Sequence, residues 1–198
     1  MTELPINRPK LTLPPAEAAR LREAYALATV ILEYGSGGST VVAAELPGKQ
    51  VFSVESDAAW LADMQAYFVA NPPLANLHLH HGDIGPTRSW GYAKDEAAFR
   101  KWPGYPLSVW DLADFPHPDV VLIDGRFRAA CFLTCLFKIT RPTIVLWDDY
   151  IDRAFYHRVE DLVKPVEMIG RMARFEITPM PVPLDRLAWV FETYLRQN

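Results

Sequence analysis

Glu33-Tyr34-Gly35-Ser36-Gly37-Gly38-Ser39-Thr40 is the stretch of sequence that decides the fold. It follows the β-branched and apolar run from Thr29 to Leu32, which is typical of a short buried strand. Its glycines allow a sharp turn, and a helix is predicted from Val41 to Leu46, where Pro47-Gly48 ends it. The stretch therefore predicts a strand, a tight turn and a helix in succession.

The same alternation of apolar runs and helix-forming segments continues along the chain. Further strands are predicted at Gln50–Val54, Asn76–His81, Asp119–Ile123 and Thr143–Trp147. Helices are predicted at Ala16–Leu27, from the capping residue Asp57 to about Ala70, at Phe127–Ile139 and at Asp152–Val163. This order predicts an α/β fold with a doubly wound, Rossmann-like sheet that is mostly parallel and has helices on both faces.

Two segments fall outside this alternation. Arg174–Thr178 and Arg186–Tyr194 are β-prone and are joined by a proline-rich stretch, so we expect them to close the sheet as an antiparallel pair. That pair gives a sheet of about seven strands in one domain spanning residues 1–198. Residues 84–118 are rich in aromatic residues, proline and glycine, and we expect a lid or a substrate-binding loop there. The alternative, that these aromatic residues only pack the segment onto the core, stays open.

Composition narrows the classes of partner. The net charge is −4 and the pI is about 5.7, so the chain lacks the basic surface expected of a protein that binds nucleic acid or an anionic membrane. No apolar stretch is long enough to span a bilayer, and Met1 to Lys10 lacks the apolar core of a secretory signal. We expect a cytoplasmic protein with a small-molecule substrate and no nucleic-acid or membrane partner, and a homodimer is left open.

Acidic and glycine residues follow several predicted strands, where ligands of open α/β sheets bind. Glu55 ends the second strand 22 residues after Glu33, close to the offset of about 20 residues at which an acid binds ribose hydroxyls. Counting the dinucleotide pattern G-x-G-x-x-G from Gly35 puts Thr40 at the third glycine. The pattern therefore disfavours a nicotinamide cofactor.

The same residues resemble the class I S-adenosylmethionine-dependent methyltransferases, whose first motif is E/D-x-G-x-G-x-G. Here Ser39 stands at the last glycine position, and we expect it to cap the following helix. The resemblance runs from about Ala16 to Tyr194. It includes the strand-end residues Glu55, Gly82-Asp83 and Asp124 and the C-terminal antiparallel pair.

The resemblance implies S-adenosylmethionine as the cofactor and methyl transfer to an oxygen or nitrogen of a small molecule. It implies that Glu33 and the turn formed by Gly35, Ser36, Gly37, Gly38 and Ser39 hold the methionine end, that Glu55 with the adjoining Ser56 holds the ribose, and that Asp83 with the backbone of Ile84 holds the adenine.

Charged residues after the fourth and fifth strands are the candidates for chemistry, and we single out Asp124, Arg126 and Asp148. We predict no metal, because Arg126 or Arg128 competes for the carboxylate oxygens and the second acid caps the next helix. The alternative takes Asp124, Asp148 and Asp149 as a site for a divalent cation such as Mg²⁺, similar to metal-dependent catechol-type O-methyltransferases. Arg126 also suits a carboxylate or phosphate on the acceptor.

Two further alternatives remain. His80, His81 and His157 are candidate bases, although a single histidine is usually structural. A methyltransferase-like binding protein without turnover is also consistent with the altered glycine motif and the lack of an obvious base.

Overall fold

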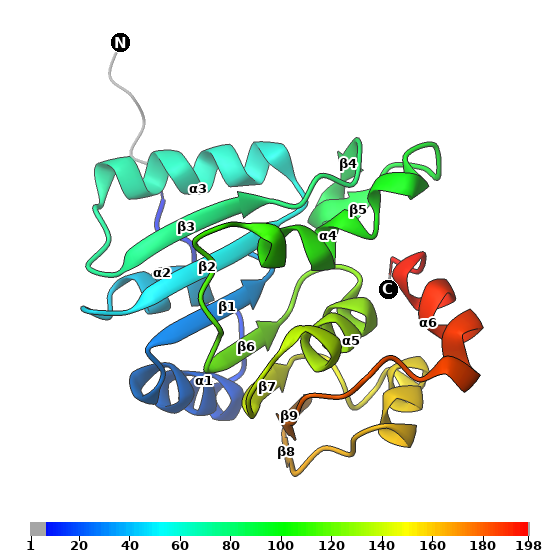
Figure 1. Cartoon of the computed structure of the whole chain (residues 1–198). Coiled ribbons are helices and arrows are strands. Elements are labelled where there is room, and N and C mark those ends of the chain that lie inside the picture. The colour runs from blue at the N-terminus through cyan, green and yellow to red at the C-terminus, as the bar shows by residue number, and fades with distance from the viewer. Residues whose placement is uncertain (1–6, 198) are drawn as a thin grey trace.

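The computed structural model describes residues 7–197. Residues 1–6 and 198 of the predicted domain lie outside the described residues. Most of the segment Met1 to Lys10, which is predicted to lack a secretory signal, lies outside them as well. A seven-stranded sheet in the order β3-β2-β1-β6-β7-β9-β8 forms the centre of the molecule (Figure 1). Its strands are β1 Val30–Tyr34, β2 Gln50–Glu55, β3 Asn76–His81, β6 Val120–Ile123, β7 Thr143–Trp147, β8 Glu167–Ile169 and β9 Met172–Ile177.

The sheet confirms the predicted doubly wound class. Strands β3, β2, β1, β6 and β7 pair in parallel, and β9 pairs antiparallel with both β7 and β8. Strands β2 and β3 are added on one side of β1, and β6 and β7 on the other, so the strand order reverses between the neighbouring strands β1 and β6. Ligands of such sheets bind outside the strand ends at this point.

Helices cover both faces of the sheet, as predicted (Figure 1). The long helices are α1 Pro15–Leu27, α2 Gly38–Ala44, α3 Ala58–Ala70, α5 Arg128–Lys138 and α6 Leu187–Tyr194. Residues of α1 and α2 pack with Ile31 in one core cluster, while residues of α5 and α6 pack with Leu32 in another. Successive strand residues point to opposite faces, so Glu33 projects toward α1 and Tyr34 toward α5.

One of the two strands predicted at the C-terminus is wrong. Arg186–Tyr194 forms α6 instead of a strand, and β8 is the partner of β9. The burial of Trp189, Val190 and Thr193 has helical spacing, whereas Phe191, which an alternating strand would bury with them, is 66% exposed. The predicted helix Asp152–Val163 is a 3₁₀ helix over Ala154–Asp161.

Residues 84–118 contain short elements and no long structureless loop. A two-stranded hairpin, β4 Thr87–Arg88 with β5 Tyr92–Ala93, is followed by the helix α4 Gly104–Leu107. Trp102 and Tyr105 are buried in the core cluster of α5, whereas Trp90 at the hairpin tip is 86% exposed. Within residues 7–197, no helix has the length and apolar character needed to cross a membrane.

Candidate functional site

The loops after β1 and β6 touch at the point where the strand order reverses. Gly35 has φ +104°, and a Cβ atom placed on it would lie 2.7 Å from the backbone nitrogen of Gly125. A Cβ atom on Gly125 would lie 2.8 Å from the backbone nitrogen of Gly35. Neither position admits a side chain, so both glycines are required by the contact between the two loops.

Glu33 does not line the crevice. Its side chain is fully buried on the α1 face, where it accepts hydrogen bonds from the Tyr25 hydroxyl at 2.7 Å and the Thr40 hydroxyl at 2.6 Å. Burial raises the pKa of the Glu33 carboxyl, and the hydroxyl donors lower it in part. The structure therefore gives Glu33 two partners inside the protein and separates it from Glu55 at the strand ends.

The glycine turn begins α2 three residues earlier than the predicted helix. Gly37 precedes the helix, and its N–H donates to the Thr40 hydroxyl at 3.0 Å, so the expectation that Ser39 caps the helix is wrong. Ser39 lies inside α2 and is buried. A Cβ atom on Gly38 would lie 2.1 Å from the backbone nitrogen of Leu11, which crosses over this turn.

Glu55 reaches the crevice, but both of its oxygens already accept hydrogen bonds. Oε2 accepts from the Ser36 N–H at 3.1 Å, and Oε1 accepts from the N–H groups of Ser56 at 2.7 Å and Asp57 at 2.9 Å. The side chain is only 8% exposed, and this burial raises its pKa while the N–H donors lower it.

Gly91, at the hairpin between β4 and β5, covers Glu55. Its carbonyl oxygen accepts a hydrogen bond from the Ser56 hydroxyl at 2.9 Å. A Cβ atom on Gly91 would lie 2.5 Å from the Ser56 hydroxyl oxygen and 3.2 Å from Glu55 Oε1. The backbone of Gly91 therefore lies directly against Glu55 and Ser56.

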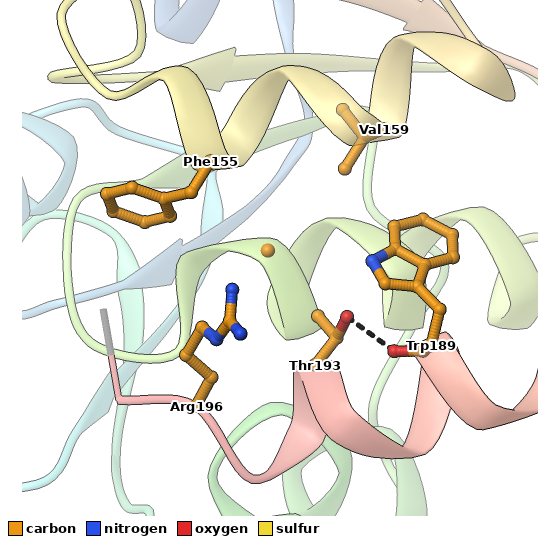
Figure 2. A pocket seen from close by; sticks show the side chains of 6 residues that line it. Phe155, Val159, Trp189, Thr193 and Arg196 are labelled. Atoms are coloured by element: carbon orange, nitrogen blue, oxygen red, sulfur yellow. Dashed lines mark hydrogen bonds between the residues drawn. The ribbon is translucent and has the colours of Figure 1, made fainter.

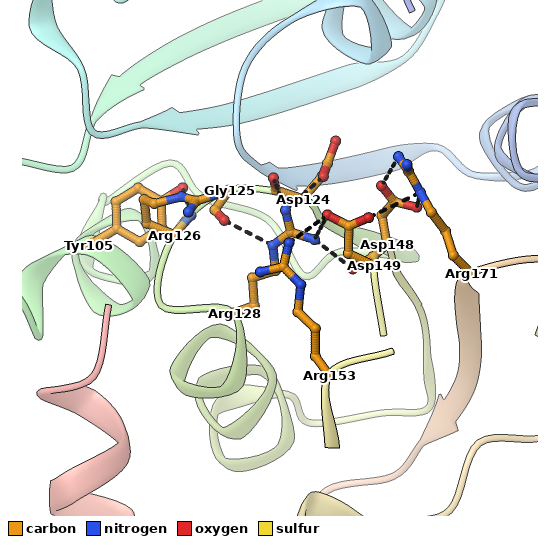
Figure 3. Close-up of polar contacts among 9 residues, drawn as sticks. All are labelled: Tyr105, Asp124, Gly125, Arg126, Arg128, Asp148, Asp149, Arg153 and Arg171. Carbon is orange, nitrogen blue, oxygen red and sulfur yellow. Dashed lines mark hydrogen bonds and ion pairs between the residues drawn. The ribbon is translucent and has the colours of Figure 1, made fainter. Parts of the chain in front are cut away.

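Tyr105, on α4, fills the neighbouring space. Cβ atoms placed on Gly125 and on Gly82 would lie 2.1 Å from its hydroxyl oxygen and 2.7 Å from its Cδ2 atom, respectively. The ring therefore spans the ends of β6 and β3, and it is fully buried. Burial, together with the charge of Glu55, raises the Tyr105 pKa well above its ordinary value. Figure 3 shows Tyr105 beside Gly125 and Arg126.

The crevice has the acid and glycine residues of the family motif, and their chemistry suits S-adenosylmethionine. In the described conformation, Gly91 and Tyr105 lie against these residues. The described cavities lie elsewhere: one of about 20 Å³, room for about one water molecule, lies between α5, α6 and the 3₁₀ helix Ala154–Asp161 (Figure 2). A second, open hollow lies along α3 and β3.

The residues expected near adenine are at the crevice edge. Asp83 is half exposed, binds Lys101 at 2.7 Å and accepts the Gly85 N–H at 2.8 Å. The Lys101 contact lowers the pKa of Asp83. Ile84 is fully buried in the core, so its side chain faces away from solvent.

Asp124, Asp148 and Asp149 lie together, with carboxylate oxygens within 4.8 Å of one another. Arg128 binds Asp124 at 3.1 Å, and Arg171 binds Asp148 through two hydrogen bonds of 3.0 and 2.7 Å (Figure 3). Arg153 binds Asp149 at 2.9 Å, so each of the three carboxylates is paired with at least one guanidinium. The expected pairing by Arg128 is present, and the guanidiniums occupy oxygens that a divalent cation would need.

The network affects the pKa of Asp124 and the contacts of Asp149. Burial raises the pKa of Asp124 to about 7, although the charge of Arg128 lowers it and those of Asp148 and Asp149 raise it further. Asp149 adopts φ +55° and contacts three arginines, so the expectation that the second acid only caps a helix is wrong. Its side chain turns back to the network because its backbone is left-handed.

Arg126 stands apart from this network. Among the described residues, no carboxylate oxygen lies within 4.0 Å of its guanidinium, which lies 4.1 Å from the centre of the Tyr92 ring. Arg126 is buried, and its Nε atom has no hydrogen-bond partner in the part of the chain that the structure describes. A buried guanidinium of this kind is suited to an anionic group.

The candidate histidines each contact a group of the protein. His80 Nε2 lies 2.7 Å from the Ser108 hydroxyl, and the Nε2 atoms of His81 and His157 each lie 3.3 Å from a backbone carbonyl oxygen. Burial lowers the pKa of His80.

Sequence reasoning missed four residues that shape the site, Gly91, Tyr105, Arg153 and Arg171. Arg153 is only four residues from Asp149 in the sequence, but the two do not share a helix, so their helical ion-pair spacing gave no valid signal. The other three reach the site from distant parts of the chain.

Comparison with solved structures identifies the family. A methyltransferase-like protein from Silicibacter pomeroyi DSS-3 is 53% identical, with a TM-score of 0.91 over 96% of this chain and 98% of that chain. The chain belongs to the class I S-adenosylmethionine-dependent methyltransferase family. No protein-family model matches this methyltransferase-like chain, and a comparison with curated proteins gives no match.

Two more distant neighbours of the methyltransferase-like chain share the fold. The O-methyltransferase TomG from Streptomyces achromogenes, in complex with S-adenosylmethionine, is 13% identical with a TM-score of 0.58 over 86% of this chain and 82% of that chain. An O-methyltransferase from Bacillus cereus, in complex with S-adenosylhomocysteine, is 15% identical with a TM-score of 0.58 over 84% and 82%.

Proposed function

We propose that the chain binds S-adenosylmethionine at the ends of β1, β2 and β3 and transfers its methyl group to an oxygen or nitrogen of a small molecule. The observation that carries this proposal is the convergence of the Gly35 turn, Glu55 and Asp124 at the point where the strand order reverses. The bound cofactor would supply an activated methyl group. Glu55 and Ser56 would hold the ribose, and Asp83 with the Ile84 backbone would hold the adenine.

Three residues of the chain have proposed roles toward the acceptor. Arg126, which has no carboxylate partner among the described residues, would hold an anionic group. Asp124, with its pKa raised to about 7, would accept a proton near neutral pH. Asp148 is held by two hydrogen bonds from Arg171 and would act as a positioning residue that fixes the network around Asp124.

The setting of the reaction follows from composition. Because the chain has a net charge of −4, we propose a small-molecule acceptor in the cytoplasm and no nucleic-acid or membrane partner. The residues proposed for the site all belong to one chain, so a homodimer would not be needed to complete it.

Calorimetry with S-adenosylhomocysteine tests cofactor binding. We expect the wild type to bind, and Glu55→Gln to weaken binding about tenfold because the amide loses a charge-assisted acceptor for the ribose hydroxyls. Glu45→Gln is the matched control, because Glu45 is an exposed carboxylate that pairs with Arg8. An absence of heat at millimolar ligand in the wild type and in the Gly91→Ala and Tyr105→Ala variants would refute the cofactor assignment.

A second candidate is a methyltransferase-like binding protein without turnover. The filled crevice and the saturated hydrogen bonding of Glu55 favour it. Binding of S-adenosylhomocysteine, without methyl transfer from S-adenosylmethionine to any member of a broad acceptor panel, would select this candidate over the enzyme.

A further inference from the structure

The segment of residues 85–107 contributes two residues, Gly91 and Tyr105, to the crevice at the strand ends. Gly91 lies on Glu55 and Ser56, and Tyr105 lies on Gly125 and Gly82. In the described conformation, the chain itself therefore lies against Glu55 and the glycines at the strand ends, where a cofactor would bind. Resting on the proposed function, we infer that this segment is an internal occupant of the cofactor crevice and that it moves outward before the cofactor binds.

The contacts that hold the hairpin tip are few and polar. The Ser56 hydroxyl donates to the Gly91 carbonyl oxygen at 2.9 Å, and the guanidinium of Arg126 stacks on the Tyr92 ring. The Ala93 N–H donates to the Gln197 side-chain oxygen at 2.9 Å. Contacts of this kind are readily exchanged for water, so opening the tip costs little apolar burial.

The backbone of the tip favours movement. Gly85, before the hairpin, and Gly91, in its tip, have φ values of +88° and +68°, which suits them to act as hinges. Trp90 also has a positive φ of +66°, although a bulky side chain disfavours this region, and its indole is 86% exposed. The closed tip therefore holds a strained residue whose side chain gains little burial in return.

Tyr105 makes the deeper contact. Its ring is fully buried and packs at 5.8 Å from the Phe127 ring and 5.9 Å from the Tyr34 ring, measured between ring centres. Lifting the tip uncovers Glu55, whereas removing the ring opens the space between the ends of β3 and β6. The two variants below address these two parts separately.

Gly91→Ala tests the tip. The added Cβ atom would meet the Ser56 hydroxyl oxygen at 2.5 Å, and the φ of +68° would also be strained for alanine, so the closed position is disfavoured. We expect the variant to bind S-adenosylhomocysteine about tenfold more tightly than the wild type by calorimetry, because less of the protein is in the competing closed state. Gly104→Ala is the matched control in the same segment, since nothing lies within 4 Å of its added Cβ atom, and its affinity should equal that of the wild type.

Tyr105→Ala tests the contribution of the buried Tyr105 ring in the same assay. We expect tighter binding here as well, whereas Tyr156→Ala, which removes a fully buried tyrosine packed against Trp147, should leave affinity unchanged while lowering the melting temperature. Binding by the wild type that is not strengthened by Gly91→Ala or Tyr105→Ala overturns the inference and leaves the proposed function standing. Absence of binding by the wild type and both variants overturns the proposed function and the inference together. Binding by a variant alone supports both.

Discussion

Gly35 and Gly37 belong to the same motif but have different structural tasks. Gly35 has a positive φ and touches the Gly125 backbone, while nothing lies within 4 Å of a Cβ atom on Gly37. We expect Gly35→Ala to lower the free energy of unfolding by more than about 2 kcal/mol, because both backbone strain and a clash with main-chain atoms oppose it. Gly37→Ala should cost clearly less. Urea titrations of both variants provide the measurement, and equal losses would contradict the distinction.

Asp124 makes stability depend on pH. Its folded pKa of about 7 lies above the value of about 3.9 for an unfolded aspartate, so the folded state binds this proton more tightly. Its contribution to stability is full below about pH 4 and is lost as the pH rises through about 7. In urea titrations from pH 5 to pH 8, the free energy of unfolding of the wild type should fall as the pH rises. Asp124→Asn should make this fall smaller. The difference should be less than about 1.4 kcal/mol per pH unit, because the Asp124 side chain is 31% exposed.

Asp83→Asn is the control for that pH series. Its pKa is lowered by Lys101, so its contribution is present above the unfolded pKa and is lost only as the pH falls below it. The dependence between pH 5 and pH 8 should therefore match that of the wild type. A slope unchanged in Asp124→Asn would contradict the raised pKa.

At the scale of elements, Asp57 determines where α3 begins. Its carboxylate accepts hydrogen bonds from the N–H groups of Ala59 at 2.9 Å and Trp60 at 3.2 Å, as the sequence predicted for a capping residue. Asp57→Ala should lower the free energy of unfolding by about 0.5–2 kcal/mol. Asp63→Ala, an exposed site within the same helix, should change it by less than about 0.5 kcal/mol in thermal or urea unfolding. A larger effect at Asp63 would contradict this.

The sequence predicts the elements well where burial follows a clear period. The parallel strands and α1, α3 and α5 lie close to their predicted bounds, because apolar runs and caps are local signals. The segment that became α6 misled because Trp189, Val190 and Phe191 are β-prone residues, and their propensity yields to the packing of Trp189 and Thr193 against the core. Filling of the crevice by Tyr105 was not predictable, because it depends on a contact between distant parts of the chain.

At the scale of the whole molecule, Arg128, Arg153 and Arg171 reach the three-aspartate network from different parts of the chain and bind its carboxylates. We expect millimolar MgCl₂ to leave the melting temperature equal to that in NaCl of the same ionic strength, because a cation would have to displace guanidiniums. Arg171→Ala frees Asp148 and should make the melting temperature rise with Mg²⁺. A specific rise in the wild type would instead favour the divalent-metal alternative through Asp124, Asp148 and Asp149.

The close backbone contact between Gly35 and Gly125 limits which residues can replace them during evolution. Two main-chain loops that cross this closely tolerate only hydrogen at either α-carbon, whatever the protein does with a ligand. A descendant that had lost all chemistry would still be held to both glycines by the need to fold. Retention of this fingerprint during evolution is therefore a record of architecture, and activity has to be established by assay in each lineage.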